Sequence, residues 1–214
     1  MKKKILVVVS MLLGFFTVQA QDIKSLFIAL PDSLSPLLTK VNREDFGDFL
    51  ASNMKAEVKN RFGKVSEMLK LTPDYLKLRV STSSTAEMKL LPLNDSVKVI
   101  CVVRTYEGPA SDSQVSFYDT DWKELPADRF LQLPVEDAFY KSVTSEVEMD
   151  SLKNLRARAD MYLLKADLSE KDNTLLFSYT TPDYLDKKTS EELKPYLLAV
   201  PLRCEWKEGH FVLP

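Results

Sequence analysis

The chain has 214 residues, with 29 Lys and Arg against 31 Asp and Glu, which gives a net charge of -2 with histidine neutral. This mixed-sign surface has no electrostatic footprint for nucleic acid or an anionic membrane, so we expect neither as a partner. The apolar content of 45% is that of an ordinary folded protein, and the length fits one domain. The chain has only five glycines and no G-x-G-x-x-G or Walker pattern. A glycine-rich nucleotide-binding loop is therefore excluded.

The first twenty residues have the pattern of a cleavable signal peptide. Lys2, Lys3 and Lys4 precede an apolar stretch over residues 5–16, and Val18 and Ala20 place small residues at the -3 and -1 positions. The stretch is shorter than the roughly 20 residues that span a bilayer. We expect cleavage after Ala20, export to the periplasm or beyond, and a mature chain of residues 21–214 that is not inserted in a membrane.

Helical periodicity dominates from residue 22 to about residue 54. One run recurs at helical spacing until Pro31 stops it: Ile23, Leu26, Phe27 and Leu30. Ser35 before Pro36 has the pattern of a helix N-cap followed by the first helical position. Asn42 is a candidate cap of a further helix, whose apolar face would be Phe46, Phe49, Leu50 and Met54.

Residues 55–71 fit either a helix or a hairpin, and we favour the hairpin. From residue 75 the apolar period changes to two, which predicts a meander of about four strands. Only one face of these strands is clearly apolar, so we expect an antiparallel sheet with one side covered. The strands should include Tyr75–Val80, Glu87–Leu91, Val97–Val103 and Val115–Phe117.

The second half repeats this order after a predicted helix at Met149–Ala159. A further helix is expected at Pro182–Leu193, between the second and third strands. The expected strands are Tyr162–Leu168, Leu175–Tyr179, Leu198–Trp206 and Phe211–Leu213. The sequence therefore predicts an α+β fold in which N-terminal helices pack on antiparallel β-sheet built from two related four-strand halves, residues 55–125 and 150–214.

Catalytic groups are scarce, because the chain has a single histidine, His210, near its C-terminus. A Ser-His-Asp or Cys-His site would depend on this one residue, and a zinc site would lack the usual clusters. No spacing singles out a pair of carboxylates for glycoside hydrolysis. We expect no catalytic residues, no metal site and no cofactor.

Two cysteines, Cys101 and Cys204, occupy matching strands of the two halves, and alternation places both on the apolar face. In an oxidising compartment they are candidates for a disulfide. The alternative is two separate buried thiols that act as small apolar side chains. The sequence leaves both possibilities open.

The segment from Phe117 to Trp122 alternates aromatic and acidic residues. Tyr118 and Trp122 are candidates for contacts with a glycan or peptide, together with Asp119 and Asp121. The alternative is a strand end whose aromatics complete the core while its aspartates face water. The two aspartates alone are a weak calcium signal, because the other ligands of a calcium loop do not follow.

Several short motifs between Phe27 and Trp122 resemble a family of exported Bacteroidetes proteins of unknown function. They are Leu30-Pro31-Asp32-Ser33, Asn42-Arg43 with Asp45, Lys89 to Leu93, Asp95-Ser96, the Val97 to Val103 strand, Gly108-Pro109, Asp112-Ser113, and Phe117-Tyr118 leading to Trp122. The resemblance implies export and one architecture for most of the mature chain. It implies no activity.

The sequence thus favours a non-enzymatic envelope protein that binds a protein, peptide or glycan ligand. One alternative is a hydrolase that uses carboxylates at the Tyr118–Trp122 edge on an envelope polymer. Another is a carrier of an apolar ligand, which would need an interior cavity between the sheet and the helices.

Overall fold

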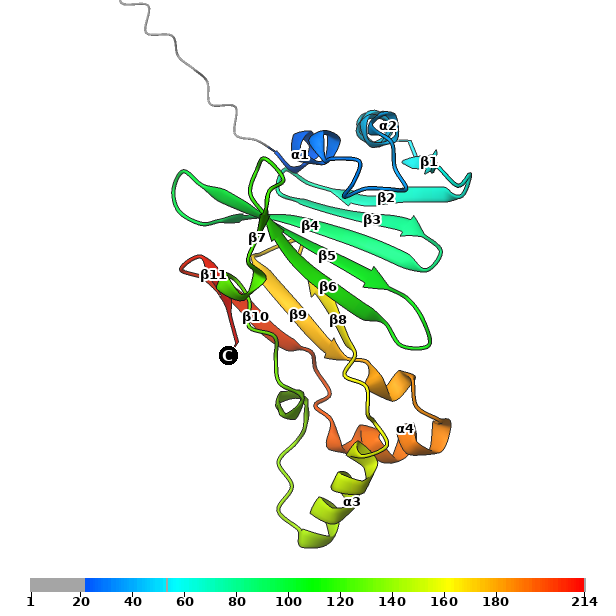
Figure 1. Cartoon of the computed structure of the whole chain (residues 1–214), viewed down its shortest axis with the longest axis vertical. Helices are drawn as coiled ribbons and strands as arrows, with labels where there is room; N and C mark the ends of the chain where they lie inside the picture. The colour runs from blue at the N-terminus through cyan, green and yellow to red at the C-terminus, as the bar shows by residue number, and fades with distance from the viewer. Residues whose placement is uncertain (1–21, 53, 214) are drawn as a thin grey trace, which may run out of the picture.

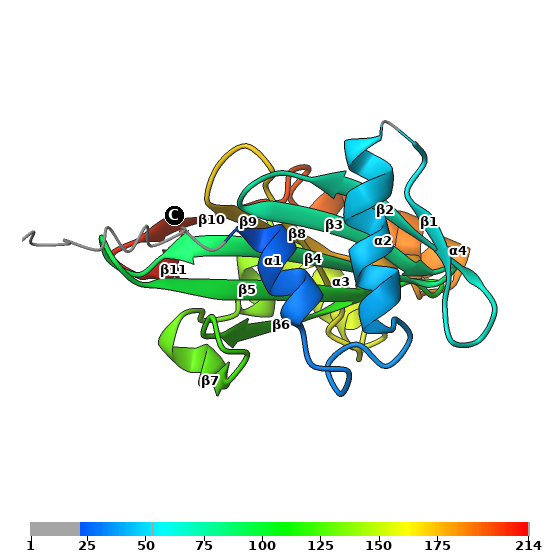
Figure 2. The same ribbon diagram turned by 90° about the horizontal axis from the view of Figure 1, so that it is seen from above.

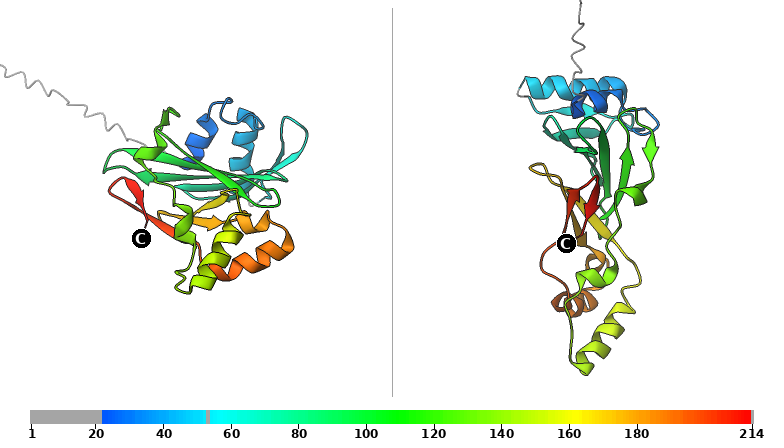
Figure 3. Two further views of the ribbon diagram at one scale, coloured as in Figure 1. Left: turned by 60° about the horizontal axis from the view of Figure 1, so that its bottom comes forward. Right: turned by 90° about the vertical axis from the view of Figure 1, so that its left-hand side faces the viewer.

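The computed structural model describes residues 22–52 and 54–213 in three stacked layers (Figure 1). The predicted signal peptide lies outside the described residues. Two N-terminal helices cover one face of a seven-stranded sheet, a four-stranded sheet packs on the opposite face, and two further helices lie at the far end (Figures 1 and 3). The α+β class with N-terminal helices on antiparallel sheet is confirmed. The helices are α1 (Ile23–Ala29), α2 (Lys40–Ala51), α3 (Glu146–Arg156) and α4 (Lys187–Leu193).

The seven-stranded sheet, called the first sheet here, is a simple antiparallel meander in chain order. Its four central strands, β3 to β6, are those that the alternation predicts. The favoured hairpin at residues 55–71 is confirmed as β1 and β2, and its turn holds Gly63 at a φ of 70°. Its strands are β1 (Glu57–Lys59), β2 (Val65–Leu71), β3 (Tyr75–Ser81), β4 (Ser84–Pro92), β5 (Lys98–Tyr106), β6 (Asp112–Tyr118) and β7 (Glu124–Leu125).

The second sheet has four strands in the order β11-β10-β9-β8. The first sheet exceeds the expected four because the β1–β2 hairpin and β7 extend the meander at its two edges. Leu198 and Val200 were expected in a strand but are exposed and precede β10. The strands are β8 (Leu164–Leu168), β9 (Thr174–Tyr179), β10 (Leu202–Lys207) and β11 (His210–Val212), and short 3-10 turns lie at Ala127–Arg129, Glu136–Phe139, Thr181–Asp183 and Lys194–Tyr196.

Both faces of the first sheet are covered, which corrects the expectation of one covered side. Leu76, Met88 and Val102 pack toward the helices. Val99 and Cys101, on the other face, pack against the second sheet. The continuous apolar run of β5 is the sequence signal of this double coverage, because strands with both faces buried lose their alternation.

The N-terminal helices begin differently from two of the predictions. The side chain of Asp22 accepts the Ser25 N–H and caps α1. Thr39, rather than Asn42, caps α2, and Asn42 closes the capping box three residues later. Ser35 and Pro36 start no helix, since residues 31–38 form a linker of turns between α1 and α2. Seen from above, the two helices lie side by side across the strands (Figure 2).

Side chains of the first sheet close the edge of the second sheet at β8. The N–H of Leu164 donates to Asp112 Oδ1 at 3.2 Å, and that of Ala166 donates to Ser113 Oγ at 2.9 Å. The N–H of Leu168 donates to Glu87 Oε2 at 2.7 Å. These bonds satisfy alternate donors of an edge strand, which otherwise invites pairing with another chain.

Candidate functional site

The structure buries the aromatic residues of the predicted recognition segment. Tyr118 and Trp122 are 3% and 7% exposed and belong to the core beneath the helices. The indole Nε1–H of Trp122 donates to the carbonyl of Leu26 in α1 at 3.0 Å. Neither ring offers a surface to a glycan or peptide, so the structure supports the alternative in which the aromatics complete the core.

The acidic residues of that segment build its turn. Asp119 Oδ1 accepts the N–H groups of Asp121 and Lys123, each at 2.9 Å. Trp122 takes a φ of 64°, a left-handed conformation that this turn requires. Asp121 is exposed. Across residues 22–52 and 54–213, no group of three or more His, Cys, Asp or Glu side chains could hold a metal ion.

Cys101 and Cys204 are both fully buried in the core between the two sheets, and both are free thiols. The structure thus does not form the candidate bridge. Burial raises the pKa of Cys204 to about 11 and raises the pKa of Cys101 as well, which keeps both thiols protonated at neutral pH. His210 is exposed in β11.

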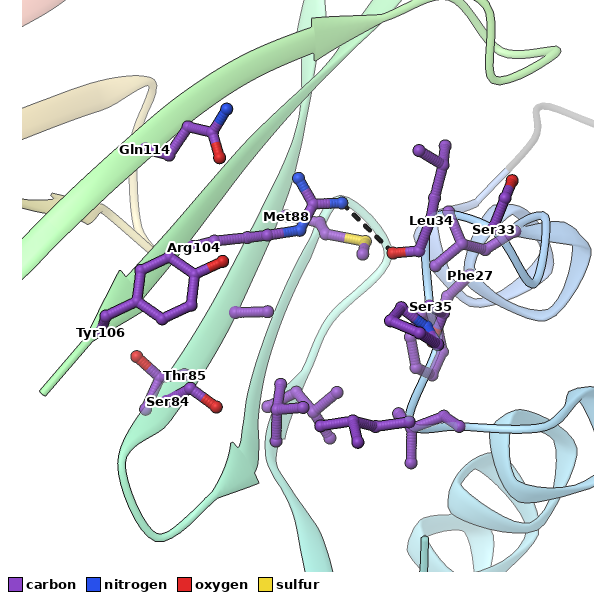
Figure 4. A pocket seen from close by; sticks show the side chains of 17 residues that line it. Phe27, Ser33, Leu34, Ser35, Ser84, Thr85, Met88, Arg104, Tyr106 and Gln114 are labelled. Carbon is purple, nitrogen blue, oxygen red and sulfur yellow. Dashed lines mark hydrogen bonds between the residues drawn. The ribbon is translucent and has the colours of Figure 1, made fainter. Parts of the chain in front are cut away.

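A groove lies between the linker of residues 31–38 and the face of the first sheet (Figure 4). Its volume is about 440 Å³. Apolar side chains from α1, the linker, β3 and β4 form most of it, and polar side chains from β4, β5 and β6 lie along one side. Its lining residues are Phe27, Leu30, Ser33, Leu34, Ser35, Pro36, Leu37, Leu38, Leu78, Val80, Ser84, Thr85, Ala86, Met88, Arg104, Tyr106 and Gln114.

The floor of the groove is the face of the first sheet, and the strand register explains which side chains lie on it. Ala86 of β4 lies opposite Leu78 of β3 and Arg104 of β5, and Arg104 lies opposite Gln114 of β6. Side chains in such a row share one face of the sheet. The row begins apolar at β3 and becomes polar toward β6, while the helices cover the neighbouring row that contains Met88.

Arg43 of α2 holds the linker that forms the opposite wall. Its side chain is 2% exposed and donates to the carbonyls of Leu30 and Leu38 at 2.7 and 2.8 Å. The same guanidinium contacts Asp32 Oδ1 at 3.1 Å and holds the pKa of that carboxyl below its usual value. At the far end of the linker, the N–H of Arg61 donates to the Leu37 carbonyl at 2.9 Å.

Arg104 is the one charged residue among those that line the groove. It is half-buried, and its Nη2 donates to the carbonyl of Leu34 at 3.3 Å across the groove (Figure 4). No carboxylate of the described residues lies within 4.0 Å of its guanidinium. A cation therefore faces an apolar space without an opposite charge.

The sequence analysis missed this site, because Arg104 has the pattern of a solvent-facing residue in a strand of alternating apolar and polar residues. The motif Leu30-Pro31-Asp32-Ser33 and the Asn42-Arg43 pair were the available signal. The structure uses them to shape the linker and to start α2. Their position in the chain gave no indication that the linker faces β5.

Comparisons with known proteins agree with the fold and name no activity. The family model described as "Protein of unknown function (DUF3256)" matches residues 15–211. The solved structure of a domain of an uncharacterized protein from Porphyromonas gingivalis W83 is similar, with a TM-score of 0.78 at 28% sequence identity over 89% of this chain and 96% of that chain. No curated protein matches.

Proposed function

Since the chain belongs to the DUF3256 family of proteins of unknown function, we propose its function from its own groove: a non-enzymatic protein that binds a small amphipathic ligand between the linker and the first sheet. Among the alternatives from the sequence, this is the carrier of an apolar ligand. The groove between the linker and the first sheet is the observation that carries the proposal.

The size and lining of the groove support a small ligand. Its volume of about 440 Å³ lies within the range of about 300–1,000 Å³ that is usual for small-molecule sites. Such sites are mostly apolar, with a few polar groups that fix the orientation of the ligand. Leu78, Ala86 and Met88 supply the apolar floor here, and Arg104 and Gln114 supply polar groups at one side.

The alternative of a carboxylate-based hydrolase finds less support. No described residue that lines the groove is an Asp, Glu, His or Cys, so the groove offers no general acid, base or nucleophile of these kinds. Asp119 and Asp121 stand at a surface turn whose aromatic neighbours are buried. A hydrolase at that edge would have little of the Tyr118 or Trp122 ring available to contact a substrate.

We also propose that the protein works outside the cytoplasm. The support is the pattern of residues 1–20, with its lysines, its apolar stretch and its small residues before Gln21. None of the helices within residues 22–52 and 54–213 is long and apolar enough to cross a membrane. Detection of a chain that begins at Gln21 in the envelope fraction would test this proposal.

A neutral fluorescent probe tests the binding function. N-phenyl-1-naphthylamine should bind the chain of residues 21–214 saturably, with one probe per protein. Ala86→Phe puts a ring on the floor of the groove and should abolish this binding. Ala199→Phe makes the same substitution at an exposed site outside the groove and should leave binding intact. Thermal unfolding of both variants checks that they are folded.

Two results would refute the proposal. The first is a wild-type protein that binds no probe. The second is a folded Ala86→Phe variant that binds the probe as well as the wild type does. Because Ala86 is only 8% exposed, overpacking could unfold that variant. Ser84→Phe, at the partly exposed start of β4, then blocks the same groove from its rim.

A further inference from the structure

The groove has one cation and no anion. Arg104 is the only charged side chain in its lining, and its one hydrogen bond to a described residue is the bond of 3.3 Å to the Leu34 carbonyl. A guanidinium has five N–H donors. Half-burial of Arg104 limits the water that can satisfy the others, so a ligand atom that accepts hydrogen bonds would be favoured at this place.

The position of Arg104 relates this charge to the apolar part of the groove. Arg104 lies between Ala86 and Gln114 in the register row, so it marks the boundary between the apolar and polar sides. In Figure 4 the guanidinium of Arg104 points across the groove toward Leu34. The opposite side of the groove, on the strands, holds Gln114, Tyr106, Ser84 and Thr85. A ligand with one apolar end and one anionic end would match both parts.

We propose that the ligand is a single aliphatic chain ending in a carboxylate, with the carboxylate on Arg104 and the chain against the apolar floor and wall. This inference rests on the proposed binding function. A planar guanidinium pairs with a carboxylate through two parallel hydrogen bonds, which a point charge cannot do. One cation matches one negative charge, so a carboxylate fits the groove better than a doubly charged phosphate.

The size of the groove favours such a chain over a folded protein partner. A standard protein interface buries about 800 Å² on each side. The groove is instead a concave space of about 440 Å³ with an apolar floor. A single chain can fill that space and leave its carboxylate near the polar side at β5 and β6.

Displacement of the bound probe by three chains of equal length tests the inference. Dodecanoate, dodecanol and dodecylamine share their apolar part and differ only in head group. Dodecanoate should bind the wild type about tenfold or more tightly than dodecanol, as expected for a charge-assisted pair. Dodecylamine should be the weakest, because its ammonium would face Arg104.

Substitution of Arg104 tests whether this residue binds the head group of the ligand. Arg104→Gln keeps a polar side chain but carries no charge, so dodecanoate should lose its tenfold advantage while dodecanol binding stays the same. Arg104→Lys keeps the charge without the two-point geometry and should retain part of the advantage. Arg79→Gln, the same change at an exposed arginine of β3, should alter neither ligand.

The outcomes separate this inference from the function on which it rests. If the probe fails to bind, the binding function itself is wrong. If the probe binds but the ratio of dodecanoate to dodecanol affinity is unchanged by Arg104→Gln, only the carboxylate assignment is wrong. If a peptide with a C-terminal carboxylate displaces the probe in an Arg104-dependent manner and dodecanoate does not, the aliphatic chain is the wrong ligand.

Discussion

Glu87 connects the two sheets. Its replacement by Ala should lower the free energy of unfolding more than a substitution at the surface does. One carboxylate oxygen accepts the N–H of Leu168 at 2.7 Å, and the other contacts Lys77 Nζ at 2.5 Å. The side chain of Glu87 is only 4% exposed. Its removal leaves the N–H of an edge strand without an acceptor in the contact between the sheets.

The two lost contacts determine how far the free energy of unfolding should fall in Glu87→Ala. A buried donor left unsatisfied costs about 1–3 kcal/mol. Lys77 is one-third exposed and lies 3.8 Å from Asp167, so its ammonium can be hydrated or re-paired and adds less. We expect Glu87→Ala to lower the free energy of unfolding by about 3 kcal/mol. Glu87→Gln keeps an acceptor for Leu168 and should cost about 1 kcal/mol.

Urea unfolding followed by circular dichroism measures both values. Glu191→Ala is the control, because Glu191 is exposed and its pair with Lys187 spans 3.9 Å within α4. That control should stay within about 0.5 kcal/mol of the wild type. An equally small effect for Glu87→Ala would refute the view that Glu87 joins the sheets.

The pH dependence of Glu87 adds a second test with a definite sign. Burial raises its pKa above the usual value, and the Lys77 ion pair only partly opposes this effect. The folded state therefore holds the proton more tightly than the unfolded state. This contribution to stability is complete below about pH 4.5 and is lost as the pH rises through the folded pKa. Relative to Glu87→Gln, the wild type should be more stable at pH 4 than at pH 7, and the opposite trend would refute the assignment.

Three other predictions concern the linker, the core and the thiols. Arg43→Lys should lower the free energy of unfolding in urea by about 2 kcal/mol, since one ammonium cannot reach both linker carbonyls; a loss below about 0.5 kcal/mol would contradict this role. Trp122→Phe should cost about 1 kcal/mol and remove blue-shifted fluorescence, because the indole is buried and bonded to Leu26; a red-shifted signal from Trp122 would argue against this placement. Cys101 and Cys204 should react with Ellman's reagent only after unfolding, as two equivalents; no reaction in denaturant would instead indicate the disulfide.

The strands were predictable from sequence because their burial follows a local period. Leu76 and Leu78 of β3 alternate with charged residues, and so do Leu164 and Ala166 of β8, so strand positions emerge without knowledge of the fold. The burial of Glu87 and Lys89 was not predictable in this way. Both lie between the sheets, and each has a hydrogen bond to a backbone group 81 residues away, at Leu168 for Glu87 and at Glu170 for Lys89.

The candidate site could not be predicted for a related reason. Ser35-Pro36 is a good local helix start, yet contacts from Arg43 to Leu30 and Leu38 hold the segment as a linker. Local propensity is a weak prior that tertiary contacts override. The groove exists only where this linker faces Arg104, and that pairing spans 70 residues of chain.

The closed edge of β8 makes the second sheet depend on the first. Hairpins between neighbouring strands build the first sheet, and such local contacts form readily. The acceptors for β8 belong to β4 and β6, which precede β8 in the chain. The contact between Glu87 and Leu168 joins residues that are 81 positions apart. The second sheet thus has a closed β8 edge only when it is packed against the first sheet. Residues 150–214 alone would lack these acceptors and would present an open strand edge to other chains.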